Sequence, residues 1–301
     1  MTALLSRLTV ALFWLLHWLP LPVLALIGQA VGEALYWFAW PRRHVVDVNL
    51  ALCFPELDDA ARRRLARAHF RAVGRSLVER GLLWWASEAR LKRLIRLEGA
   101  ERLRALLDGG RPVILLAPHF IGLDMGGSRV AMEFDSVSIY ARQNNPVFDH
   151  WLYHGRSRFG DQLLLSRQDG VRGTVKAMKA GRPFYYLPDM DYGRKDAIFV
   201  PFFGVPAATI TGLSRLGRLA GAAVVPCVTR MLPGGRGYVA EFGEPWPDFP
   251  TRDVESDTAQ MNRWIESVVR TMPEQYYWVH RRFKTRPPGE ARPYRGPRRR
   301  R

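Results

Sequence analysis

The clearest structural signal in this chain is a short apolar run that ends at a histidine, Pro112-Val113-Ile114-Leu115-Leu116-Ala117-Pro118-His119. The run is continuous, rich in branched side chains and bounded by proline, which is typical of a strand buried on both faces. In an open α/β sheet, the residues just beyond the carboxyl end of such a strand lie in the crevice where sites are usually built. The run therefore predicts a parallel strand that presents His119 at the edge of a sheet.

Three more strand-like runs recur along the chain, and segments with helical patterns separate them. The runs are Ser136 to Tyr140, Pro183 to Leu187 and Ala223 to Val228, and the helical segments are 148–159, 171–180 and 210–220. Alternation of this kind is typical of an α/β fold. We expect a mainly parallel central sheet flanked by helices.

The histidine has a carboxylate five residues further on, in the sequence His119-Phe120-Ile121-Gly122-Leu123-Asp124. If a helix begins near Gly122, the carboxylate of Asp124 can turn back to hold one imidazole nitrogen, and the other nitrogen then faces substrate as a general base. The same spacing also fits a hydrogen-bonded histidine beside an ordinary helix-capping aspartate. Both interpretations stay open on this motif alone.

Composition narrows the class of protein. The chain has 301 residues, of which 48% are hydrophobic, enough for one sizeable α/β domain with a smaller appendage. Its formal net charge of +17 favours phosphates, anionic lipid or nucleic acid as partners, without choosing among them. Only Cys53 and Cys227 occur, so neither a disulfide framework nor a multi-cysteine zinc site is indicated.

The amino-terminal stretch from Leu8 to Gly28 has His17 as its only ionisable side chain and is about as long as a bilayer is thick. Pro20 and Pro22 interrupt it, so a bent span, a re-entrant helix pair and an interfacial anchor all remain open. We expect membrane attachment rather than a cleaved signal peptide. The basic remainder of the chain places the globular body on the cytoplasmic side.

Two further segments are strongly basic. Residues Asp58 to Arg80 predict an amphipathic helix with one basic stripe (Arg64, Arg67, Arg71, Arg75) and an opposite apolar side (Ala66, Phe70, Val73, Leu77). That helix fits a core-packed element with a solvated basic face, or one that faces lipid headgroups. The segment from Arg281 onward is rich in proline and arginine and predicts a disordered tail.

Other candidate site residues follow predicted strands. Arg142 comes after one strand and could bind a phosphate. Asp189 and Asp191 follow another and fit either a metal-free turn or a direct catalytic role. His150 and His154 share a helical face, but no third ligand is evident, so we predict no metal site. No Walker loop or GxGxxG fingerprint occurs, so a nucleotide cofactor has no support.

Several segments, taken in order, carry a family resemblance. They are the apolar amino-terminal segment, His119 to Asp124, Asn145-Pro146 with Gly155 to Arg158, Pro188 to Gly193, Phe199 to Gly204, Val224 to Pro226 and, most specifically, Pro273 to Pro287. In their order and residue content, these segments resemble the late acyltransferases of bacterial lipid A biosynthesis, within the lysophospholipid acyltransferase superfamily. The resemblance covers nearly the whole chain.

The resemblance implies a glycerolipid acyltransferase-like fold and transfer of a fatty acyl group from an acyl carrier protein thioester to a hydroxyl of a phosphorylated lipid A precursor. The site would lie at the cytoplasmic face of the inner membrane and need no cofactor. Membrane lipids are expected partners, and nucleic acid is not. His119 would be the general base, oriented by Asp124. The implied organisation is a membrane anchor (1–40), an acyltransferase domain (41–285) and a basic, disordered tail (286–301).

Substrate contacts are expected from a polar set: Arg142, Arg156, Arg167, Asp189, Asp191 and Tyr192. Arg142 departs from the family pattern, because an arginine often directly follows the tyrosine whereas Ala141 follows Tyr140 here. Arg156 matches the family's glycine-arginine step more closely. The pair Arg281-Arg282 is a further candidate for anion contacts. The alternatives are the same reaction on another glycolipid or lysophospholipid, and a non-enzymatic basic protein that binds membrane or nucleic acid.

Overall fold

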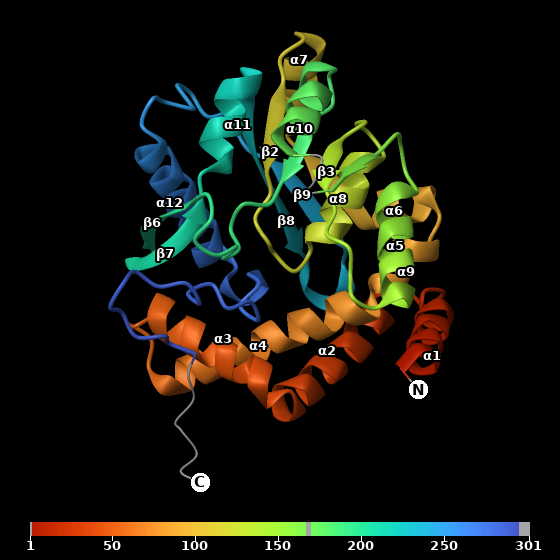
Figure 1. The fold of residues 1–301 in the computed structure, drawn as a ribbon. Helices are drawn as coiled ribbons and strands as arrows, with labels where there is room; N and C mark the ends of the chain where they lie inside the picture. The colour runs from red at the N-terminus through yellow and green to blue at the C-terminus, as the bar shows by residue number, and fades with distance from the viewer. Residues whose placement is uncertain (1, 167–169, 295–301) are drawn as a thin grey trace.

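The structure is a computed structural model that describes residues 2–166 and 170–294 (Figure 1). Its centre is a seven-stranded sheet of order β1-β9-β8-β2-β5-β3-β4. Neighbouring strands are parallel except β8 and β9, which are antiparallel, so the expected mainly parallel sheet is confirmed. The strands are β1 (Ile95–Glu98), β2 (Val113–Leu116), β3 (Val137–Ile139), β4 (Leu163–Leu165), β5 (Phe184–Tyr186), β8 (Ala223–Met231) and β9 (Tyr238–Phe242). Strands β6 (Ala197–Phe202) and β7 (Val205–Ile210) form a separate antiparallel pair.

Strand β2 lies in the middle of the sheet and all four of its residues are buried. Successive side chains of a strand point to opposite faces. Val113 and Leu115 accordingly pack in a cluster with side chains of α7 (Ala100–Asp108) and α8 (Leu123–Ala131). Ile114 and Leu116 pack in another cluster with α10 (Gly170–Lys179), α11 (Gly212–Ala220) and α12 (Val254–Thr271). Helices therefore cover both faces, which explains the continuous apolar run.

The remaining helices gather at one end of the sheet. In Figure 1, α2 (Leu21–Phe38), α3 (Trp40–Cys53) and α4 (Asp59–Val78) cross the lower end, and α1 (Thr2–Leu16) lies beside them. Helices α5 (Arg80–Trp85), α6 (Glu88–Leu94) and α9 (Pro146–Ser157) continue around the same side. The short 3-10 turns η1 (Pro233–Gly235) and η2 (Pro273–Gln275) pack on α2 and α4 respectively. This layer of helices forms the floor beneath the carboxyl ends of the parallel strands.

The apolar stretch from Leu8 to Gly28 is two helices rather than one. Helix α1 ends at Leu16, and α2 begins after Pro20, which precedes it as the N-cap residue. Among residues 2–166 and 170–294, α2 is the one helix long and apolar enough to cross a membrane, and 33% of its residues are buried. Gly28 and Gly32 of α2 meet Gly74 of α4 so closely that a Cβ on Gly74 would lie 2.2 Å from the Gly28 carbonyl oxygen. Helix α2 is therefore held against the body of the protein.

The predicted amphipathic helix over 58–80 is confirmed as α4, with Asp58 accepting the backbone N–H of Ala61 at 2.6 Å as its N-cap. Two positions differ from the predicted stripes. Arg75 is buried, because Glu79 and a backbone carbonyl draw its guanidinium inward, and Leu77 is 41% exposed. Arg67 and Arg71 do lie at the surface, where both pair with Glu33 of α2.

Candidate active site

The imidazole of His119 is held by the carboxylate of Asp189. Nδ1 of His119 lies 2.7 Å from Oδ1 of Asp189, and the backbone N–H of His119 donates to Oδ2 at 2.9 Å. The sheet brings the two together: Leu116 of β2 is paired with Tyr186 of β5, and each site residue is the third beyond its strand residue. Two parallel strands thus present a histidine and a carboxylate at the same height on one edge.

This pairing corrects the expectation that Asp124 orients His119. The carboxylate of Asp124 is taken up by two arginines: Oδ2 accepts from Arg80 Nη1, and Oδ1 accepts from Arg156 Nη2 at 2.8 Å. Asp124 lies in the first turn of α8, as predicted, but the partner of the imidazole is Asp189. Local spacing favoured Asp124, whereas the contact actually made spans 70 residues of chain.

The closing motif of the chain supports the histidine from its other side. Phe120 and Tyr276 form an isolated antiparallel bridge, and the backbone N–H of Tyr277 donates to the carbonyl oxygen of His119 at 3.0 Å. Ile121 donates its N–H to Gln275 at 2.7 Å. A small cavity lies at this junction, and its lining consists of Asn49, His119, Asp189, Met190, Tyr276, Tyr277, Trp278, His280 and Arg282. The most specific segment of the sequence therefore forms a wall of the site.

Asp191 stabilises the loop that carries Asp189. Its carboxylate accepts from the backbone N–H of Gly193 at 2.9 Å and from the backbone and hydroxyl of Thr285 at 2.7 and 2.9 Å. Its own N–H donates to His280 Nε2 at 3.0 Å. Tyr192 of the same loop donates its hydroxyl to a carbonyl at the end of β5. His280 therefore has a structural role, because its ring holds the backbone of this loop.

Charge is distributed unevenly around these groups. Burial opposes ionisation of Asp189, but His119 outweighs it, and the pKa of this carboxyl lies below its usual value. Burial also opposes ionisation of Asp124, where Arg156 and Arg80 hold the pKa far below the usual range. Burial, with Lys284 and Arg282 nearby, lowers the pKa of His280 to about 4, so its ring is neutral and can accept the N–H of Asp191.

The other predicted contacts are dispersed. The side chain of Arg142 is 88% exposed and lies 3.6 Å from Asp149, at the start of α9. Arg282 is buried, where it donates to Ala208 and Thr209 at 2.8 and 2.7 Å, so it is a structural cation and not a surface anion contact. Arg281 lies over the ring of Tyr294. Arg167 and the arginines of the tail from 295 onward lie outside the described residues.

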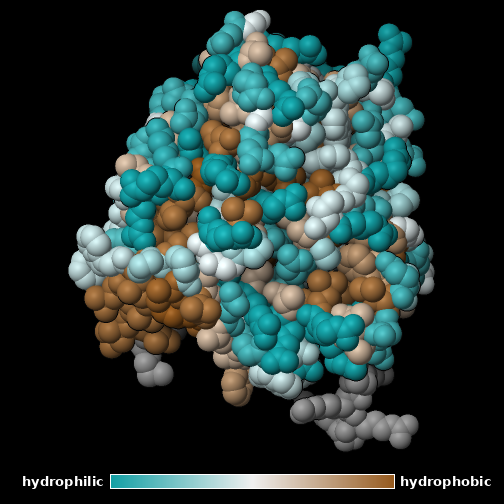
Figure 2. Space-filling model, turned by 180° about the vertical axis from the view of Figure 1, so that it is seen from behind, coloured by the Kyte–Doolittle hydropathy of each residue, from teal (hydrophilic) through white to brown (hydrophobic). Residues whose placement is uncertain are grey.

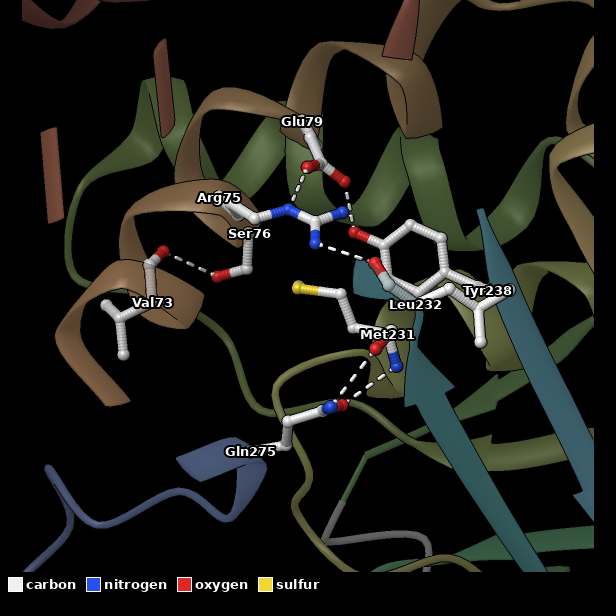
Figure 3. Close-up of polar contacts among 8 residues, drawn as sticks. All are labelled: Val73, Arg75, Ser76, Glu79, Met231, Leu232, Tyr238 and Gln275. Carbon is white, nitrogen blue, oxygen red and sulfur yellow. Dashed lines mark hydrogen bonds and ion pairs between the residues drawn. The ribbon is translucent and has the colours of Figure 1, made fainter. Parts of the chain in front are cut away.

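A buried polar cluster joins the end of α4 to the turn after β8 and to β9 (Figure 3). Arg75 Nε donates to Glu79 at 2.8 Å, and the hydroxyl of Tyr238 donates to the other oxygen of that carboxylate. Burial raises the pKa of Glu79 despite the nearby Arg75. The ring of Tyr238 packs against Gly122, the residue before α8, and Arg80 directly follows Glu79. The cluster therefore fixes both the arginine and the helix that meet at Asp124.

Sequence reasoning missed two site residues. It did not identify Arg80 as a partner of Asp124, since no local pattern links positions 44 residues apart. It also did not assign Asp189 to the imidazole, although the equal offset from two neighbouring strands was a usable signal.

His150 and His154 share one helix, and in the described part of the chain no group of three metal-ligating side chains occurs.

A buried carboxylate that orients a histidine at the carboxyl edge of a mainly parallel sheet defines an α/β enzyme site suited to deprotonating a hydroxyl. Two arginines bind the carboxylate of Asp124, five residues further along the chain. The comparisons identify the family. A family model for bacterial lipid A biosynthesis acyltransferases matches residues 2–285, and this chain belongs to that family. It is therefore an acyltransferase of lipid A biosynthesis, and the non-enzymatic alternative is set aside.

Individual relatives agree over most of their length. The lipid A biosynthesis lauroyltransferase of Escherichia coli is 37% identical over 286 residues, which cover 95% of this chain and 93% of the relative. The palmitoleoyltransferase and myristoyltransferase of the same organism are 34% and 29% identical, covering 93% and 91% of this chain and 91% and 83% of their own. A solved structure, the 1-acyl-sn-glycerophosphate (LPA) acyltransferase PlsC of Thermotoga maritima, aligns with 90% of this chain and 97% of its own at 13% identity. Its TM-score is 0.36.

Proposed function

We propose that this enzyme transfers a fatty acyl group from an acyl carrier protein thioester to a hydroxyl of a phosphorylated lipid A precursor, at the cytoplasmic face of the inner membrane. The observation that carries the mechanism is the pair of hydrogen bonds from His119 to buried Asp189. They fix the proton on Nδ1, and among the described residues Nε2 has no hydrogen-bond partner. Nε2 is the nitrogen left for substrate.

In the proposed reaction, Nε2 of His119 accepts the proton of the acceptor hydroxyl as that oxygen attacks the thioester carbonyl. Asp189 stabilises the imidazolium that forms, as in other carboxylate-histidine pairs. The tetrahedral intermediate collapses with cleavage of the C–S bond, and the leaving thiolate takes the proton back from His119. The ester and the free thiol are the products.

The arginine pair at Asp124 supports an anionic substrate. Arg80 and Arg156 share a single carboxylate, so the group carries net positive charge beside the first turn of α8. A guanidinium is well suited to bind phosphate oxygens in a bidentate manner. We propose that this cluster, with Arg156 as the expected substrate contact, faces the phosphorylated acceptor or the oxyanion of the intermediate.

Attachment to the membrane is proposed through the exposed apolar face of α1 and α2, which Figure 2 shows as a brown patch at the lower left. Leu4, Leu8, Leu12 and Leu15 lie on one stripe of α1, and each is 51% or more exposed. Exposed tryptophans near the ends of the two helices (Trp14, Trp18, Trp37, Trp40) suit the headgroup level. Because α2 also packs on α4, residues 1–40 fit an interfacial anchor on domain 41–285 better than a free span.

The test is mass spectrometry of the lipid formed when the full chain, in detergent or vesicles, is given acyl carrier protein thioester and a lipid A precursor. The proposal predicts a product with one additional ester-linked chain. The same assay on lysophospholipid and on other glycolipids serves as the acceptor control. Transfer to one of those acceptors but not to the precursor would overturn the proposed substrate.

A further inference from the structure

A shallow groove lies on the outer surface between α10 and α11, away from His119. Its apolar lining is Val171, Val175, Ala180 and Leu219, and its basic lining is Arg172, Lys176 and Lys179. The two largest exposed apolar side chains here, Val171 and Leu219, are 52% and 58% exposed. The groove thus combines an apolar floor with a basic rim, which is the usual anatomy of a protein-binding surface.

Within the described part of the chain, the cations of this rim have no internal partner. No ion pair or hydrogen bond of the side chains of Arg172, Lys176 or Lys179 occurs among residues 2–166 and 170–294, in contrast to Arg182 nearby, which pairs with Asp161. Like charges three or four residues apart on a helix repel one another. An acidic partner relieves that repulsion and is attracted over a distance.

The groove is also correctly placed for a partner that delivers substrate. Helix α10 follows β4, which is parallel to β2 through β3 and β5, so the chain enters α10 from the sheet edge that carries His119. A helix of this length reaches back about 15 Å from that edge. In Figure 1, α10 and α11 lie at the end of the molecule opposite α1 and α2. A bilayer under the apolar face of α1 therefore leaves this groove open to the cytoplasm.

We infer that the groove between α10 and α11 docks the acyl carrier protein, through an acidic helical surface with an apolar side chain at its centre. The inference rests on the proposed function and adds where the donor binds. The carrier's flexible arm then brings its thioester around the sheet edge to His119. The basic rim sets the rate of encounter, and Val171 and Leu219 provide the apolar contact.

The test compares two double variants. In the first, Arg172 and Lys176 of the groove are both replaced by glutamate. In the control, Arg93 and Arg111, which are also exposed but lie outside the groove, are both replaced by glutamate. Both variants change the net charge by the same amount. The inference predicts that KM for the acyl carrier thioester rises at least about tenfold in the first variant only, with kcat retained. Transfer from a small thioester such as acyl-pantetheine stays equal in all three proteins, because it does not use the groove.

A second variant tests the apolar floor. Leu219→Asn changes an exposed side chain, so folding is preserved, and KM for the carrier should rise while binding to anionic vesicles does not change. Equal carrier KM in the wild type and both groove variants overturns the inference but leaves the proposed function intact. Loss of vesicle binding with unchanged carrier kinetics also overturns it, by showing a membrane surface. A wild type that uses acyl-pantetheine but not the carrier thioester contradicts the proposed donor itself.

Discussion

Replacing Asp189 by asparagine tests whether Asp189 or Asp124, the carboxylate favoured by local sequence spacing, orients the imidazole of His119. Asp189 accepts two hydrogen bonds from His119, one from the backbone N–H and one from Nδ1. An amide offers one acceptor oxygen and one donor nitrogen in the same place. In Asp189→Asn, therefore, one of the two hydrogen bonds must be lost or must reverse its direction.

Either arrangement of the amide harms the site. If its oxygen keeps the backbone N–H, its NH₂ group donates to Nδ1, which moves the ring proton to Nε2 and removes the base. If its oxygen keeps Nδ1–H instead, a buried backbone donor is left unpaired at a cost of about 1–3 kcal/mol. A comparable change in the serine-protease triad lowers kcat about 10⁴-fold, and we expect a loss of about 10³ to 10⁴ here.

The assay is single-turnover acyl transfer to the lipid A precursor, with nitrogen-15 NMR of the histidine rings to read the tautomer. The matched control is Asp124→Asn, which frees Arg80 and Arg156 but does not touch the imidazole in this structure. We expect an altered tautomer in Asp189→Asn alone. An Asp189→Asn enzyme that retains a tenth or more of the wild-type rate would show that Asp189 does not orient the catalytic imidazole.

Three further predictions concern the scaffold. Gly74→Ala places a Cβ 2.2 Å from the Gly28 carbonyl oxygen and 2.3 Å from the Gly32 nitrogen, so the free energy of unfolding should fall by about 1–3 kcal/mol, as calorimetry would show. Tyr238→Phe leaves one oxygen of buried Glu79 unpaired and should cost a similar amount in urea unfolding, with the transfer rate lowered as Arg80 loosens. Burial lowers the pKa of His69 from 6.5 to about 4, so the unfolded chain binds a proton at a higher pH than the folded protein does. The free energy of unfolding should therefore be highest above pH 6.5 and fall by about 2 kcal/mol between there and pH 5. His69→Gln should lack this part of the pH dependence.

Much of the fold could be predicted because the parallel strands carry an unusually plain pattern. The runs 113–117, 136–140, 183–187 and 223–228 correspond to β2, β3, β5 and β8, each within a few residues. β1 and β9 contain charged residues, and β4 is a partly exposed strand at the edge of the sheet, so the apolar pattern alone did not separate these strands from loops. The apolar amino-terminal stretch was identified, but only the structure divided it at Pro20 into two helices.

The site was harder to predict, because its contacts join distant strands. His119 was placed correctly at the end of β2, since its position depends on one strand only. Its partner depends on which strand lies beside β2, and sequence does not give strand order. Arg75 shows the same limit: a helical wheel places it with Arg67 and Arg71, while Glu79 and the turn after β8 hold it inside.

The role of His119 as general base is tested by the rate of a single acyl transfer in His119→Ala. The full chain, embedded in vesicles, is mixed with acyl carrier protein thioester and lipid A precursor at saturating concentrations. We expect the variant to remain folded and to bind both substrates, while the transfer rate falls by about 10²- to 10⁴-fold. A folded His119→Ala enzyme that transfers the acyl group at the wild-type rate would contradict that role.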